Sequence, residues 1–207
     1  LRGGVAGEFQ TALKPYVLRA KLTIATKSNW KAYGSIGVEA AAAMATQTFQ
    51  QMPGPYQLVQ KGNTFGIILP GSVPRLLQFG EPTTYPQHEI VNAVVLESWR
   101  AQDIYAGIPE IGAATTGQFL PQMLGFEHLA AISFRKGCYP GQEIVARLHF
   151  KGGNKRHLYR IELDAAPPPI PGTPVEVAIE RKAAEPIGTL LNGACINFAA
   201  APKPANA

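Results

Sequence analysis

The sequence has only two cysteines, Cys138 and Cys195, among 207 residues. Two cysteines are too few for a disulfide framework, and without a CxxC pair the usual zinc and iron–sulfur cluster sites are excluded. No apolar run reaches the ~20 residues that a membrane-spanning helix needs. The first ten residues also lack the apolar core of a signal peptide. We therefore expect no membrane partner, and a place in the bacterial cytoplasm or an organelle matrix.

Charged residues are also scarce, at 16% of the chain, and they leave a net charge of +5. This charge suits an anionic partner, but alone it does not identify a nucleic-acid-binding protein. The sequence contains no phosphate-binding loop and no GxSxG elbow, and its four histidines have no metal-ligand spacing. What it does have is 46% hydrophobic residues, enough for the core of one large domain or two small ones.

The first half of the chain predicts an α+β layer of the split β-α-β type. Residues 8–26 indicate a short helix and then a strand, in which Leu22 and Ile24 alternate with polar neighbours. Ser72 resembles an N-cap and Pro74 a first-turn proline, so a helix is expected after them. The remaining elements are strands at 33–38 and 64–70 and a helix at 38–51 that ends at the prolines of PGP.

The second half predicts helices, one long loop and a boundary. Helical spacing marks 88–102, with Ile90, Val94 and Leu96 near one face, and also 142–150. Residues 104–134 are expected to form a long ordered loop, and the alternation in 155–163 predicts a strand. The prolines of 165–174 indicate a linker between an α+β region at 1–164 and a short β module at 175–207. That module contains two expected strands, 174–180 and 186–191, and a disordered tail.

The stretch KGCYPGQE, residues 136–143, contains the one cysteine whose surroundings suggest chemistry. Arg135 and Lys136 place positive charge before Cys138, and PGQEIVAR resembles a helix start whose free N–H groups point back toward it. Both features favour the reactive thiolate form. The alternative is a half-buried cysteine that packs in a turn as a small apolar side chain. Spacing alone leaves both interpretations open, whereas Cys195 in ACINF reads as inert core.

Positive charge gathers around the same stretch. Such clusters bind phosphate or carboxylate groups, although a solvated surface is the alternative interpretation. The cations are Arg135, Lys136, Arg147, Lys151, Lys155, Arg156 and Arg160.

Three blocks of sequence together resemble the YgfZ family of folate-binding proteins, relatives of the glycine-cleavage T protein, an aminomethyltransferase. The blocks are GQFLPQ at 117–122, ISFRKGCYPGQEIVAR at 132–147 and KGGNKR at 151–156. The segments 12–24 and AGIP at 106–109 also look like that family, and the resemblance covers about residues 8–163.

The resemblance implies a fold with antiparallel or mixed sheets and helices, a central folate cavity and a small C-terminal β-barrel-like module. It implies an accessory role in iron–sulfur cluster assembly or maintenance, which supports iron–sulfur enzymes including radical enzymes that thiomethylate tRNA. Tetrahydrofolate or a derivative is the implied cofactor, and the iron–sulfur enzymes are the implied partners. The motif cysteine maps to Cys138. The implied folate-contacting residues are Lys136, Gly137, Tyr139, Gly141, Gln142, Glu143, Arg147, Tyr105 and Gln122.

The sequence departs from the family pattern in ways that bear on activity. Family members carry a segment ahead of the region matched by 12–24, so one wall of the cavity is expected to be missing. Tyr105 stands where the glycine-cleavage relatives have a pterin-contacting glutamate, which argues against aminomethyl transfer and for an accessory factor with little or no catalysis. A third hypothesis is a weak contact with tRNA, for which Tyr139, Phe150 and Tyr159 are the nearby aromatic residues.

Overall fold

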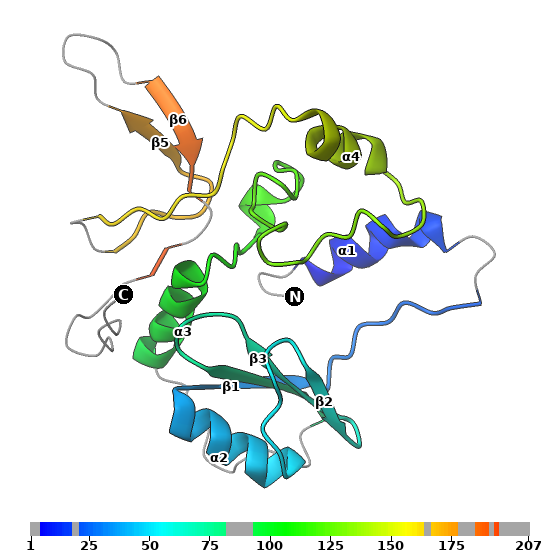
Figure 1. The fold of residues 1–207 in the computed structure, drawn as a ribbon, viewed down its shortest axis with the longest axis vertical. Helices are drawn as coiled ribbons and strands as arrows, with labels where there is room; N and C mark the ends of the chain where they lie inside the picture. Colours follow the sequence, from blue (N-terminus) through cyan, green and yellow to red (C-terminus); the bar gives the residue numbers. More distant parts are fainter. Residues whose placement is uncertain are drawn as a thin grey trace. The chain divides into compact units, whose positions relative to one another are not determined.

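A computed structural model describes residues 5–17, 21–81, 93–163, 167–177, 185–190 and 193–194 (Figure 1). These residues divide between two compact units, Ala6–Gln102 and Asp103–Cys195, with Val5 in the second. Within the described ranges, no helix is both long and apolar enough to cross a membrane. The proposed linker at 165–174 stays a prediction.

The first unit is built on a four-stranded antiparallel sheet and the helix α2. The strands are β1 (Lys31–Ile36), β2 (Leu58–Lys61), β3 (Thr64–Leu69) and β4 (Arg75–Gly80), in the order β1-β4-β3-β2. Helix α2 (Val38–Phe49) follows β1, and its alanine-rich face packs on the sheet. Its core contact consists of Ala41, Ala45, Ile68 and Leu76. The predicted strands at 33–38 and 64–70 and the predicted helix at 38–51 are confirmed, with small shifts at their ends.

Two predictions in this unit are wrong. The helix expected after Ser72 is strand β4, because residues 75–80 pair with β1 on one side and β3 on the other. Pairing on both edges outweighs a local capping signal of about 1 kcal/mol. The strand expected around Leu22 and Ile24 is also absent. The described chain there forms α1 (Ala6–Leu13), the short 3-10 helix η1 (Lys14–Tyr16) and an irregular segment in which Leu22 is 53% exposed.

Helix α3 (Ala93–Tyr105) confirms the predicted helix in that region, but with a different buried face. Val94 and Leu96 are exposed, and Ile90 lies outside the described residues. The helix buries Trp99, whose ring lies over Gly34 of β1, and the Trp99 carbonyl accepts a hydrogen bond from buried Arg75 at 3.3 Å. The buried face of α3 therefore contains the Trp99 ring and not the aliphatic side chains that the spacing suggested.

The second unit contains the 3-10 helix η3 (Ala113–Thr115), helix α4 (Gln142–Lys151) and the strands β5 (Pro174–Val177) and β6 (Glu185–Thr189). The long loop, helix α4 and the two strands β5 and β6 confirm predictions. The structure adds that β5 and β6 pair antiparallel. The strand expected at 155–163 is wrong, since this stretch has no regular structure and its alternating side chains are exposed. Alternation predicts a strand only if a neighbouring strand supplies hydrogen bonds. Cys195 and the tail lie outside the described residues.

Candidate functional site

A tight turn carries the cysteine motif into helix α4. Gly141 has φ 81° and ψ 0°, and the Gln142 N–H donates to the Tyr139 carbonyl at 3.2 Å. With Pro140 in the second position, this is the geometry of a type II turn, in which the third position favours glycine. The Gln142 side chain closes the turn from the other side, because its Oε1 accepts from the Tyr139 N–H at 3.1 Å. Residues 139–142 are therefore held by two reciprocal hydrogen bonds.

Cys138 lies directly before this turn and is exposed to solvent. The ammonium of Lys136 lies 4.1 Å from the centroid of the Tyr139 ring, within the range of a cation–π contact. This contact holds the Lys136 cation two residues before the thiol, and the first residue of α4, Gln142, follows the thiol by four residues. Of the two sequence interpretations, the half-buried packing residue is wrong. The exposed position is the one that a functional thiol requires.

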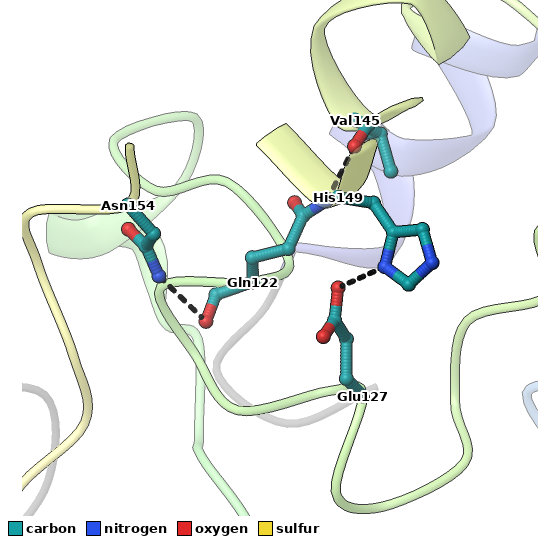
Figure 2. Close-up of polar contacts among 5 residues, drawn as sticks. All are labelled: Gln122, Glu127, Val145, His149 and Asn154. Carbon is teal, nitrogen blue, oxygen red and sulfur yellow. Dashed lines mark hydrogen bonds and ion pairs between the residues drawn. The ribbon is translucent and has the colours of Figure 1, made fainter. Parts of the chain in front are cut away.

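Gln122 ties three distant segments of this unit together (Figure 2). Its Nε2 donates to the Val145 carbonyl of α4 at 2.6 Å, and its own carbonyl accepts from Asn154 Nδ2 at 3.3 Å. The loop containing GQFLPQ, the motif helix and the KGGNKR segment thus meet at one residue. Its side-chain Oε1 is buried and has no hydrogen-bond partner among the described residues.

Helix α4 ends in an aromatic cluster that the sequence did not reveal. The His149 ring stacks on Phe134 with centroids 3.6 Å apart, and His149 Nδ1 lies 3.4 Å from Glu127 Oε1 (Figure 2). Phe150 contacts both rings in edge-on geometry. His149 is therefore a packing residue whose ring contacts two other aromatic rings. No spacing rule joins Phe134 to His149, which lies fifteen residues further along the chain.

The other predicted site residues lie at the end of α3, on α4 and in the cysteine motif. Tyr105, at the end of α3, has the Arg160 guanidinium 5.0 Å from its ring centroid. Glu143 and Arg147 are exposed on α4, and Gly137 has open space around the position of a Cβ. Among the described residues, no group of three or more His, Cys, Asp or Glu side chains could hold a metal ion.

The described part of the chain is thus an α+β protein with an exposed cysteine turn at the start of a helix. No protein-family model matches the sequence. The chain is similar to the tRNA-modifying protein YgfZ of Serratia proteamaculans (strain 568), with 39% identity over 175 residues, 81% of this chain. The chain belongs to the YgfZ family. It spans about half of that relative, 52% of its length.

Proposed function

We propose that this chain carries the thiol-bearing part of a folate-binding accessory protein that acts in iron–sulfur cluster assembly or maintenance. Its clients would include radical iron–sulfur enzymes that thiomethylate tRNA. The observation that carries the proposal is the exposed Cys138, presented by a turn that two hydrogen bonds and a Lys136–Tyr139 contact hold in place. The relative described above is a tRNA-modifying protein, which supports the tRNA-related part of the proposal. The proposed fold is that of the glycine-cleavage T protein, with β5 and β6 belonging to its C-terminal barrel-like module.

The residues near the turn have the chemistry that tetrahydrofolate requires. Lys136 and Arg147 are exposed cations, which bind the carboxylates of a folate glutamate tail. The buried Gln122 Oε1 is an acceptor whose hydrogen bond the described residues leave unmade, and a pterin offers amino and ring N–H donors. Bound tetrahydrofolate would supply a one-carbon carrier. The chain itself would supply the cations, the acceptor and the thiol of Cys138.

An accessory role fits this site better than aminomethyl transfer. That reaction needs a polar or acidic group to orient and protonate the reacting nitrogen. At the corresponding position the chain has Tyr105, whose ring is engaged by Arg160. We therefore propose a factor with little or no catalysis of its own, whose thiol contacts the ligand or a client enzyme.

Calorimetric titration of the chain with tetrahydrofolate tests the folate part of the proposal. The variant Lys136→Ala is expected to weaken binding about tenfold or more, because a hydrogen bond to a charged group contributes about 1.5–3 kcal/mol. Lys27→Ala, at an exposed position in the other unit, is the matched control and should bind like the original chain. Saturable binding that Lys136→Ala leaves unchanged would remove Lys136 from the site. The absence of any saturable heat would contradict folate binding by this chain.

A further inference from the structure

The net positive charge of the protein is concentrated in one stretch. Residues 133–163 contain seven of the 19 Lys and Arg residues and only two of the 14 Asp and Glu residues, which leaves +5. This equals the net charge of the whole chain, so the cations and carboxylates outside the stretch cancel. All seven cations are exposed. Lys136 and Arg147 are assigned above to a folate glutamate tail, and the remaining five cations are available to a polyanion.

The same stretch exposes two large aromatic rings. Tyr159 is 77% exposed and Phe150 is 74% exposed. Among the large hydrophobic residues in the described ranges, only Ile170, also at 77%, is comparably exposed. Single exposed apolar residues are ordinary on protein surfaces. Here, two of the three most exposed large hydrophobic residues lie between cations, which is a more specific arrangement.

The Phe150 ring is held in position although most of its surface faces solvent. It packs edge-on against His149 with centroids 4.8 Å apart and against Phe134 at 6.3 Å, and these two rings stack on each other. The surrounding contacts therefore limit its rotation without covering it. A ring that is already oriented loses little conformational freedom when a planar ligand stacks on it.

The segment that carries Tyr159 leaves α4 without helix or strand (Figure 1). It is fixed at its start by the hydrogen bond from Asn154 to Gln122, and further along by the contact of Arg160 with Tyr105. Lys155 and Arg156 are exposed between these two points. Lys155 and Arg156 therefore precede the Tyr159 ring along an irregular, anchored segment that begins just after Phe150 and Lys151 of α4.

We propose that this basic aromatic surface, formed by Phe150, Lys151, Lys155, Arg156 and Tyr159, binds single-stranded nucleic acid. Sequence-tolerant binding of single strands combines cations that follow the phosphates with aromatic rings on which unpaired bases stack. A duplex keeps its bases stacked on one another and cannot use these rings in the same way. The surface does not depend on folate, so this inference stands or falls separately from the proposed function.

Fluorescence anisotropy with a labelled single-stranded RNA of about 12 nucleotides, at about 50 mM salt, tests the role of the rings. Stacking contributes about 1–3 kcal/mol per base, so Phe150→Ala and Tyr159→Ala should each weaken binding about fivefold or more. Tyr16→Ala is the control, because Tyr16 is 59% exposed but belongs to the other unit. Since Phe150 also packs on His149, Phe150→Leu provides a second variant that keeps apolar volume and removes the aromatic face. It should weaken binding as well.

The role of the cations is tested by the salt dependence. Removing two phosphate contacts with Lys155→Ala and Arg156→Ala together should reduce the slope of log K against log salt by about 1.4, since each contact on a single strand contributes about 0.7. Lys21→Ala with Lys27→Ala, both exposed in the other unit, should leave the slope unchanged. The absence of binding at about 50 mM salt would overturn the proposal. So would binding that the ring variants do not weaken, or equal affinity for a duplex of the same length.

Discussion

Replacement by alanine should have opposite effects on stability at the two glycines of the cysteine motif. Both Gly137 and Gly141 have open space where a Cβ would be added, so neither replacement by alanine creates a clash. Only Gly141 has a positive φ, at 81°. An alanine side chain in the left-handed region costs roughly 1–2 kcal/mol. At Gly137 an alanine instead reduces the freedom of the unfolded chain, which stabilises a protein by about 0.4–1 kcal/mol.

Gly141→Ala should therefore weaken the start of α4, while Gly137→Ala should leave it intact or slightly more stable. A cost of 1–2 kcal/mol corresponds to a factor of about 5–30 in an opening equilibrium. Hydrogen exchange of the α4 amides, followed by mass spectrometry, measures this opening directly. Tryptophan fluorescence is unsuitable, because Trp30 and Trp99 both belong to the first unit. Alkylation of Cys138 is also a poor readout, because the thiol is already exposed.

The expected result is faster exchange across α4 in Gly141→Ala, by about 5–30-fold, with exchange in Gly137→Ala equal to or slower than that of the original chain. Equal exchange in the two variants would refute the reasoning, since it would mean that the positive φ of Gly141 does not control the start of the helix. Faster exchange in both would refute it too, and would indicate that the motif tolerates no side chain at either glycine.

Two further predictions concern the first unit and the thiol. A Cβ at Gly34 would overlap the Trp99 ring, with Cη2 only 2.7 Å away, so Gly34→Ala should lower the free energy of unfolding by about 1–3 kcal/mol in denaturation followed by tryptophan fluorescence. Gly7→Ala, in α1 with open space, is the control, and a similar loss there would contradict the packing argument. Cys138→Ser should change stability by less than about 0.5 kcal/mol, because the site is exposed, yet abolish support of an iron–sulfur enzyme in a Cys195→Ala background. Full support by the serine variant would make Cys138 a surface residue without function.

The sequence predicted elements whose signals are local. Helix α2 has strong helix formers up to a proline stop, and α4 begins where Pro140 and Gly141 specify a turn. Strand β4 was missed because its strand character comes from pairing with β1 and β3 rather than from its own residues. The Gln122 junction was missed for the same reason. Its partner Asn154 is 32 residues away, and no periodicity relates the two positions.

Helix α4 connects the turn that presents Cys138 with the basic aromatic surface. Its first residue, Gln142, closes the turn that presents Cys138, and its last two, Phe150 and Lys151, begin the basic aromatic surface. Ten helical residues span about 15 Å. Because Gln122 also holds the middle of this helix at Val145, the two ends are linked by a short element that is fixed at its centre. A ligand at the thiol and a nucleic acid at the far end would therefore not compete for the same residues, and a disturbance of the turn at Gly141 would reach both the thiol and the basic aromatic surface through one helix.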